Sequence, residues 1–341
     1  MEIRSLSKPL HVNFEIVGTC NESCTFCAAE LTSFPRRGLT SAEIMHVLKE
    51  LGDNGVYSVF LTGGEPASKK DLPEIIRRAI DLGINVTTAT NGTLINRRLA
   101  ETLKRAGLDE IQVSIHGTPT IHDSITGLSG SYERAVNAVS LLKECGIDPI
   151  VASVGMKRNY KSLPALARIV ADHGAVAYRI LRLMPNRIEM VEEVLGSNEV
   201  SWLIDEISSI REETDLELDL HIPSGCVHEQ FFDPSKFPTI SHPLMSTCTA
   251  GKATMAVLAD GLAAPCVELK QLPCGNILDL GLEEVWNSPT MNSVRSVTPE
   301  SYSGECARCQ VKNTCYSARC VAYRFDGSIL GDDVTCVKLR N

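Results

Sequence analysis

Short apolar segments alternate with longer amphipathic segments through the first two thirds of the chain. Residues 11–17 (HVNFEIV) alternate between polar and β-branched or aromatic side chains, which predicts a half-buried strand. Thr40 and Glu43 match a capping box, so we expect an amphipathic helix to begin there. The same alternation predicts strands at 57–62, 84–89, 110–115, 149–154 and 175–182, and helices at 71–82, 94–106, 131–145, 163–173 and 199–213.

Strict alternation of strands with helices predicts a parallel sheet whose strands are joined by right-handed crossovers. We therefore expect an α/β protein with an incomplete (β/α)6 barrel of the TIM type, followed by one more strand at 215–221. In such barrels the reacting groups gather where the strands end. A cysteine loop follows the first predicted strand, residues 63–66 (GGEP) follow the second, Asn91 follows the third, and Ser114 ends the fourth.

The composition changes after residue 222. Residues 222–245 hold four prolines and several aromatic residues, which indicates a connector. Eight of the 13 cysteines follow it, around a predicted hairpin at 254–265 and a short helix at 282–286. Large apolar side chains are too few there for a strong core, so we expect metal clusters to supply the cross-links. The predicted regions are a barrel at 1–222, a connector at 223–245 and a cysteine-rich domain at 246–341.

The charge balance argues against several classes of partner. The chain has 33 lysines and arginines against 42 aspartates and glutamates, a net charge of −9, and its basic residues are dispersed. Duplex nucleic acid and anionic membrane surfaces are therefore poor partners. The sequence has no run of about 18 apolar residues that would predict a membrane helix. Its first residues also lack the apolar core of a signal peptide, so we expect a cytoplasmic protein.

The cysteines fall at metal-ligand spacings rather than in the pattern of a small disulfide-bonded domain. Cys20, Cys24 and Cys27 form a C-x3-C-x2-C pattern directly after the first predicted strand. Three thiolates on one loop can hold three irons of a cubane cluster and leave the fourth iron open. An open iron indicates that a substrate or a cofactor binds there. The alternative is a structural zinc site or a ferredoxin-like cluster.

These residues resemble the motifs of the radical S-adenosylmethionine (SAM) superfamily: the three-cysteine loop, aromatic Phe26 before its last cysteine, and the GGEP sequence at 63–66. The later cysteines resemble those of its SPASM subfamily, with one departure, because four residues rather than three separate Cys315 from Cys320. A zinc ribbon is the alternative for this region, since it also uses C-x2-C pairs. The matching residues are Cys248, Gly261, Cys266, Cys306, Cys309, Cys315, Cys320 and Cys336.

The resemblance implies that SAM occupies the open iron and that the protein carries three [4Fe–4S] clusters. Glu65 and the backbone of Gly63 and Gly64 would hold the methionine amine of SAM, because glycine permits close approach and a carboxylate accepts from an ammonium group. Phe26 would flank the adenine. The candidates for contacts with the ribose or the carboxylate of SAM are Asn91, Ser114 and Ser153.

The resemblance also implies how the later cysteines divide between two auxiliary clusters. Auxiliary cluster I would lack a fourth ligand, which Cys274 could supply unless another group or a substrate does. Its other ligands would be Cys248, Cys266 and Cys320, and those of auxiliary cluster II would be Cys306, Cys309, Cys315 and Cys336.

A few isolated residues have two interpretations each. Cys226 could donate a hydrogen atom to a substrate radical, as in related epimerases, or could be an inert cysteine or a further cluster ligand. His116 could contact substrate or simply pack at a strand end. Arg179 and Arg182 could bind a carboxylate of substrate or SAM, or form ion pairs of the barrel. Cys145 is most simply a buried apolar residue.

The predicted function is abstraction of a hydrogen atom from an unactivated C–H bond by a radical SAM enzyme, an oxidoreductase or isomerase of natural-product biosynthesis. The first substrate class is a small polar metabolite of the sugar, aminoglycoside or nucleoside type, undergoing dehydrogenation, epimerisation or elimination. Only about a dozen residues precede the first strand, which leaves no room for a peptide-recognition domain and favours this class. The alternatives are a maturase of a ribosomally made peptide and a non-catalytic electron-transfer protein. An enzyme of this kind would need a flavodoxin- or ferredoxin-type electron donor.

Overall fold

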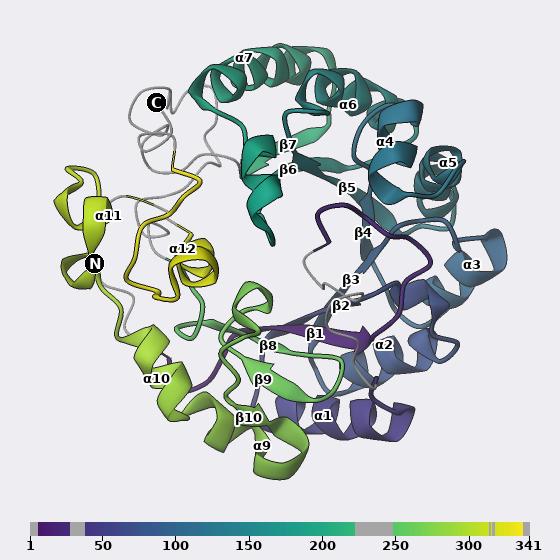
Figure 1. The fold of residues 1–341 in the computed structure, drawn as a ribbon. Coiled ribbons are helices and arrows are strands. Elements are labelled where there is room, and N and C mark those ends of the chain that lie inside the picture. Colours follow the sequence, from purple (N-terminus) through teal and green to yellow (C-terminus); the bar gives the residue numbers. More distant parts are fainter. Residues whose placement is uncertain (1–5, 28–37, 222–247, 314, 316–317, 337–341) are drawn as a thin grey trace.

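A parallel sheet surrounded by helices forms the centre of the molecule, whose computed structural model describes residues 6–27, 38–221, 248–313, 315 and 318–336 (Figure 1). Each strand from the first to the seventh pairs in parallel with the next one along the chain. This arrangement confirms the predicted α/β class and the incomplete barrel. The strands are β1 (His11–Val17), β2 (Ser58–Gly63), β3 (Asn85–Thr90), β4 (Glu110–Ser114), β5 (Asp148–Gly155), β6 (Ala177–Arg182) and β7 (Glu217–His221).

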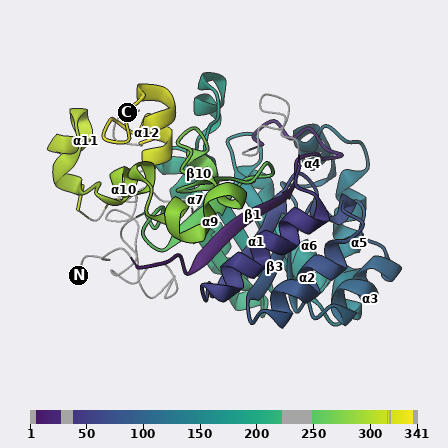
Figure 2. The ribbon, with the colours of Figure 1, turned by 90° about the horizontal axis from the view of Figure 1, so that it is seen from below.

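Amphipathic helices cover the outer face of this sheet (Figures 1 and 2). Helix α1 (Ser41–Asp53) begins with the predicted capping box, in which the Glu43 amide donates to Thr40 Oγ1 at 3.3 Å and the Thr40 amide donates to Glu43 Oε2 at 2.8 Å. The other predicted barrel helices lie within a few residues of their expected bounds. They are α2 (Leu72–Asp81), α3 (Arg97–Arg105), α5 (Ser131–Glu144), α6 (Leu163–Asp172) and α7 (Ser197–Glu213).

A short helix that the sequence pattern did not predict, α4 (Pro119–Thr126), follows β4. It spans only eight residues, and an isolated helix of that length is unstable in water. Its burial of His122, Ile125 and Thr126 against the rest of the molecule therefore stabilises it. The helix ends at Gly127, which adopts a left-handed conformation with φ of 70°.

The cysteine-rich region joins the barrel sheet directly. Strand β8 (Thr254–Val257) pairs in parallel with β1, and β9 (Leu262–Ala264) returns antiparallel beside β8 as the predicted hairpin. With β10 (Gly275–Asn276) the described sheet has ten strands in the order β10-β9-β8-β1-β2-β3-β4-β5-β6-β7. The predicted division near residue 246 thus separates two compositions but not two sheets, and the predicted connector at 223–245 lies outside the described residues.

More helix forms in the C-terminal region than the predicted segment at 282–286. That segment is the end of a longer helix, and three others follow it. In the described residues, no helix is long and apolar enough to cross a membrane. The helices of this region are α9 (Ile277–Trp286), α10 (Pro289–Arg295), α11 (Gly304–Arg308) and α12 (Arg319–Asp326). The 3-10 turns in the described residues are η1 (Pro66–Ser68), η2 (Tyr160–Ser162), η3 (Ile188–Glu193), η5 (Val267–Leu269) and η6 (Pro299–Ser301).

Candidate functional site

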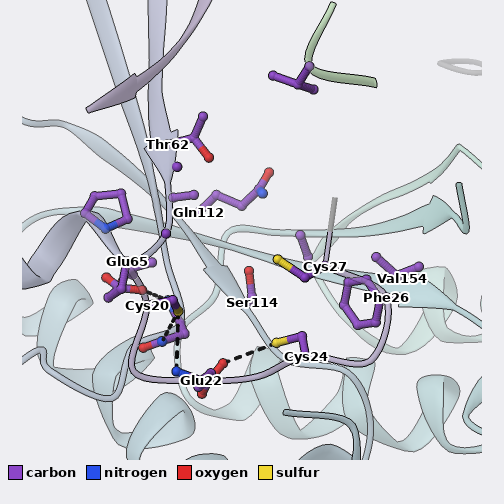
Figure 3. Close-up of a pocket in the computed structure, with 18 of the residues that line it drawn as sticks. Cys20, Glu22, Cys24, Phe26, Cys27, Thr62, Glu65, Gln112, Ser114 and Val154 are labelled. Atoms are coloured by element: carbon purple, nitrogen blue, oxygen red, sulfur yellow. Dashed lines mark hydrogen bonds between the residues drawn. The ribbon is translucent and has the colours of Figure 1, made fainter. Parts of the chain in front are cut away.

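A cavity of about 270 Å³ opens where the barrel strands end, and the cysteine loop forms part of its wall (Figure 3). The sulfur atoms of Cys24 and Cys27 point into the space that the loop surrounds (Figure 3). The structure thus brings the predicted SAM-site residues to one cavity, as expected for loops at the same end of a parallel sheet. Those that line it are Cys20, Cys24, Phe26, Cys27, Gly63, Gly64, Glu65, Asn91, Ser114 and Ser153.

Helix α4 holds the cysteine loop in place. The Ser23 amide donates to the Thr126 carbonyl at 2.9 Å, and the Thr25 amide donates to the Ile125 carbonyl at 3.0 Å. A methyl group on Gly127 would lie 2.5 Å from Ser23 Oγ, so the loop packs closely against the end of the helix. The backbone of the loop therefore has fixed partners within the protein.

The cysteines fit an iron–sulfur cluster better than a single metal ion. Burial raises the pKa of the Cys20 thiol to about 11 and also raises that of Cys24, and the neighbouring thiols add to both effects. Iron must therefore displace protons when it binds. In the described part of the chain, no three His, Cys, Asp or Glu side chains converge tightly enough to hold one metal ion. A cubane cluster, which spaces its cysteine ligands around several irons, fits this looser arrangement.

The two glycines of the GGEP sequence are required by the fold itself. Gly63 has φ of 122°, and a methyl group there would lie 2.2 Å from the Val17 carbonyl oxygen. At Gly64 a methyl group would lie 1.8 Å from the Thr19 carbonyl oxygen. The chain crosses this closely because the Gly64 amide donates to Val17 at 2.8 Å and the Glu65 amide donates to Thr19 at 2.9 Å. These bonds fasten the GGEP loop to the chain just before Cys20.

Glu65 is 1% exposed and joins the loops that follow β2 and β3. Its Oε1 accepts from Thr90 Oγ1 at 2.7 Å and from the Ala67 amide at 2.9 Å, and its Oε2 accepts from the Asn91 amide at 2.6 Å. Burial raises the pKa of this carboxyl group, although the three donors oppose the rise. The side chain is therefore already used to hold the wall of the cavity together.

Asn91 and Ser153 also have partners within the protein. Asn91 Nδ2 donates to Asn21 Oδ1 at 2.9 Å and lies 3.8 Å from Cys20 Sγ, which ties the end of β3 to the cysteine loop. Ser153 is fully buried, and its hydroxyl contacts the Ile115 carbonyl and, at 2.8 Å, Tyr178 Oη. Both residues line the cavity, but their hydrogen bonds position its wall.

His116 lies at the wall of the cavity as a neutral imidazole. Its ring meets the ring of Phe26 edge-on, with the centroids 4.7 Å apart. Burial lowers the pKa of His116 to about 3. The Val154 amide donates to its Nδ1 at 3.2 Å, so the ring proton resides on Nε2. A neutral histidine with this tautomer can donate a hydrogen bond but cannot supply a positive charge.

The polar side chains inside the barrel were not among the predicted site residues. Glu15 is 4% exposed, lines the cavity, and accepts from the Ala259 amide at 3.2 Å. The residues that line the cavity with it are Asn13, Thr62 and Gln112. The sequence does contain a signal for these residues, because they are the polar positions of alternating strands. In a barrel such positions face the interior rather than solvent.

Three of the later cysteines gather at one place. Burial raises the pKa of Cys266 to about 12, and the nearby thiol of Cys248 adds to the rise. Burial likewise raises the pKa of Cys320, which is close to both of the other thiols. Val267, the neighbour of Cys266, lines the same cavity as the cysteine loop. The predicted ligands of auxiliary cluster I therefore lie beside the candidate SAM site.

Cys274 does not join that group. It is buried in the main core, while Cys266 and Cys320 pack against a separate small cluster. Desolvation raises the pKa of its thiol, and Ser288 and Arg295 oppose the rise. Cys274 therefore packs on a different cluster from Cys266 and Cys320, and its role as the fourth ligand of auxiliary cluster I stays a prediction.

Among the predicted ligands of auxiliary cluster II, Cys306 lies in helix α11 and Cys309 ends it, whereas Cys315 and Cys336 lie outside the helices and strands. The Cys306 amide donates to Asp332 Oδ1 at 2.8 Å, and the Cys336 amide donates to the Asp333 carbonyl at 2.8 Å. Asp333 also forms a buried ion pair of 2.9 Å with Arg182 at the end of β6. Of the two interpretations of Arg182, the structure thus shows an ion pair, although its partner comes from the cysteine-rich region rather than from the barrel.

The remaining isolated cysteines can be placed only in part. Cys145 packs half-buried against the main core, as expected for an apolar residue. Cys226 lies outside the described residues.

Comparison with known proteins identifies the family. The model of the radical SAM superfamily matches residues 14–169, and that of the SPASM iron–sulfur cluster-binding domain matches residues 248–310. The chain belongs to the radical SAM superfamily and carries a SPASM domain. These matches confirm the predicted superfamily, subfamily and fold, together with the binding of SAM and iron–sulfur clusters.

Relatives of this radical SAM protein include enzymes named for different substrates. It is 26% identical to the AdoMet-dependent heme synthase of Methanosarcina barkeri, over 98% of both chains. It is 27% identical to the PqqA peptide cyclase of Gluconobacter oxydans, over 97% of this chain and 91% of that one. The mycofactocin maturase MftC of Mycolicibacterium smegmatis is 26% identical, over 98% and 84%. The structure of Streptococcus suis SuiB bound to S-adenosylmethionine shares the fold, with a TM-score of 0.77, 19% identity, and coverage of 97% and 78%.

Proposed function

We propose that this radical SAM enzyme modifies a ribosomally made peptide by abstracting a hydrogen atom from an unactivated C–H bond. The observation that carries the proposal is one cavity bordered by the cysteine loop, the GGEP loop and Val267, the neighbour of Cys266. A substrate in this cavity would lie between the SAM site and auxiliary cluster I. The relatives favour a peptide over the small polar metabolite that the sequence suggested first, because several of them are named as peptide maturases.

The chemistry of the cavity wall also supports a peptide. Glu15, Glu22 and Glu65 contribute carboxylates to it, and among the described residues that line it there is no lysine or arginine. Such a wall disfavours a substrate with several negative charges. Carboxylate and amide side chains are suited to the N–H and C=O groups of a peptide backbone. Besides Asn91, whose side chain holds the wall, the lining amides are those of Asn13 and Gln112.

We propose a division of labour among the residues of the site. Cys20, Cys24 and Cys27 would hold the first [4Fe–4S] cluster, which with SAM supplies the chemistry of hydrogen-atom abstraction when bound. The backbone of the GGEP loop would receive the methionine amine, and Glu65 would keep that loop in position. Phe26, Ser114 and His116 would contact the rest of SAM or the substrate. Asn91 and Ser153 would position the wall behind them.

Further parts of the proposal concern the auxiliary clusters and the partners. Two auxiliary [4Fe–4S] clusters would bring the total to three, and a flavodoxin- or ferredoxin-type protein would deliver the electron. Cys226 stays a proposed hydrogen-atom donor. The ligands of auxiliary cluster I would be Cys248, Cys266 and Cys320, and those of auxiliary cluster II would be Cys306, Cys309, Cys315 and Cys336.

A second candidate substrate is a tetrapyrrole of the heme type. The observation that favours it is the end-to-end match with the heme synthase of Methanosarcina barkeri, which covers 98% of both chains. The absence of cations among the described lining residues weighs against the carboxylate side chains of a heme.

The two candidates can be separated by anaerobic reconstitution with iron, sulfide, dithionite and SAM. We expect 5′-deoxyadenosine to form, and its yield to rise with a precursor peptide encoded beside this protein but not with a heme precursor. Mass spectrometry of the peptide should then show a change in mass. Cys24→Ala should abolish 5′-deoxyadenosine formation, whereas Cys145→Ala, which removes a thiol packed on the core, should not. Stimulation by the tetrapyrrole alone would favour the second candidate, and no 5′-deoxyadenosine under any condition would refute both.

A further inference from the structure

Arg319 lies in the segment where the cysteine spacing departs from the SPASM pattern, directly before Cys320. Helix α12 begins at Arg319, so Arg319 and Cys320 are successive residues of its first turn. Successive helical residues point about 100° apart around the helix axis. Cys320 lies with Cys248 and Cys266, the proposed ligands of auxiliary cluster I. The side chains of Arg319 and Cys320 therefore leave the helix in different directions.

Arg319 is directed toward the other auxiliary site. Its Nη2 lies 3.5 Å from Cys306 Sγ, a proposed ligand of auxiliary cluster II. Its Nη1 donates to the Gly331 carbonyl at 2.7 Å, and its guanidinium lies over the ring of Tyr302, 4.3 Å from the ring centroid. The residue is only 7% exposed. These contacts fix the charge in position.

The surroundings of Arg319 also include a proposed ligand of auxiliary cluster I. Arg319 Nε is buried and has no hydrogen-bond partner among the described residues. Arg319 and Cys248 line the same small cavity of about 70 Å³. One guanidinium thus contacts a proposed ligand of auxiliary cluster II and shares a cavity wall with a proposed ligand of auxiliary cluster I.

We propose that Arg319 is a shared cation that raises the reduction potentials of both auxiliary clusters. The inference rests on the proposed function, since it requires both clusters to be present. Reduction adds a negative charge to an iron–sulfur cluster, and a nearby buried cation stabilises the reduced form. A guanidinium is suited to this role because it keeps its charge when buried. Asp332, the carboxylate beside Cys306, is partly exposed to water and so offsets the charge only in part.

Redox titration of the auxiliary clusters, followed by electron paramagnetic resonance, tests the inference. The full chain would carry Cys20→Ala, Cys24→Ala and Cys27→Ala, so that only the auxiliary clusters contribute to the signal. Arg319→Gln removes the charge but keeps hydrogen-bond donors, and Arg319→Lys keeps the charge.

The matched control is Arg295→Gln. Arg295 also binds two backbone carbonyls, of Gly251 at 2.7 Å and of Trp286 at 2.8 Å, and lies 4.6 Å from the centroid of the Trp286 ring. It resembles Arg319 in these structural contacts, but its neighbouring thiol is that of Cys274, which packs on the main core rather than on the cluster that Cys266 and Cys320 contact.

We expect Arg319→Gln to shift the midpoint potentials of both clusters to more negative values, Arg319→Lys to retain most of the parent value, and Arg295→Gln to leave it unchanged. Equal potentials in Arg319→Gln and Arg295→Gln would overturn the inference. Loss of the clusters from both Arg319 variants, with circular dichroism spectra that remain native, would also overturn the inference, because Arg319 would then be required only for cluster assembly. Iron and sulfide contents of the parent that fall short of two clusters would instead refute the cluster count of the proposed function.

Discussion

Replacement of Gly64 by alanine tests whether the GGEP loop is held by the fold or shaped only for its ligand. The added methyl group would lie 1.8 Å from the Thr19 carbonyl oxygen, more than 1 Å inside the 3.0 Å limit of real Cβ contacts. Relief of the overlap should destabilise the protein by about 1–3 kcal/mol. Loss of the hydrogen bond from the Glu65 amide to Thr19 would add about 1–3 kcal/mol. The sum is a large fraction of a typical unfolding free energy of about 5–15 kcal/mol.

The matched control is Gly83→Ala. Gly83 has φ of 76° with open space around it, so the left-handed backbone alone should cost about 1–2 kcal/mol. Urea unfolding of the cluster-free proteins, followed by circular dichroism, should show a clearly larger fall in midpoint for Gly64→Ala than for Gly83→Ala. Iron loading after reconstitution should fall in the same order, because the crossing lies next to Cys20. Equal midpoints would refute the reasoning and leave close approach of a ligand as the reason for glycine at 64.

Three further substitutions test other parts of the structure. Gly127→Ala should lower iron loading more than Gly130→Ala, because both glycines are left-handed but only at Gly127 would the methyl group meet another residue, Ser23 Oγ at 2.5 Å; equal loading would contradict this. Asp123→Asn should destabilise the cluster-free protein by about 1–2 kcal/mol, since Asp123 accepts three hydrogen bonds at the start of α5. Although burial opposes the shift, these bonds lower the pKa of Asp123 from 3.8. The stabilisation by the Asp123 carboxylate should therefore be complete at higher pH and should fall as the pH drops below 3.8. The same difference in urea midpoint between wild type and Asp123→Asn at every pH would contradict this. Asp333→Asn should cost about 3–5 kcal/mol in urea unfolding, because it leaves a buried guanidinium without its counter-charge; a change below about 1 kcal/mol would place the pair in the class of solvent-exposed bridges.

The barrel could be predicted because its signals are local. Each strand shows its own apolar pattern, and the capping box of Thr40 and Glu43, which spans only four residues, marks the start of α1. The pairing of β8 with β1 gives no such signal, because two parallel strands far apart in sequence are joined by no turn of characteristic composition. Helix α4 was missed for a related reason. It is too short to be stable alone, so its contacts with the cysteine loop and the core determine it.

For the site, too, only the local features could be predicted. The spacing of Cys20, Cys24 and Cys27 shows that they share one loop, and strand-end positions bring Ser114 and Ser153 to the cavity. The sequence does not reveal which partners such residues find. Ser153 pairs with Tyr178 from the next strand, and this pairing depends on the register between β5 and β6 rather than on either segment alone.

The pairing of β8 with β1 explains how two chemically distinct parts of the chain come to share one cavity. Strand β1 leads into the cysteine loop, and the hairpin of β8 and β9 leads to Cys266 and Val267. Because both segments belong to one sheet, backbone hydrogen bonds between β1 and β8 set the geometry between the cysteine loop and Cys266. The ion pair between Arg182 and Asp333 adds a second tie at the opposite side of the barrel opening. The SPASM domain is therefore built into the barrel sheet and forms part of the wall of the cavity.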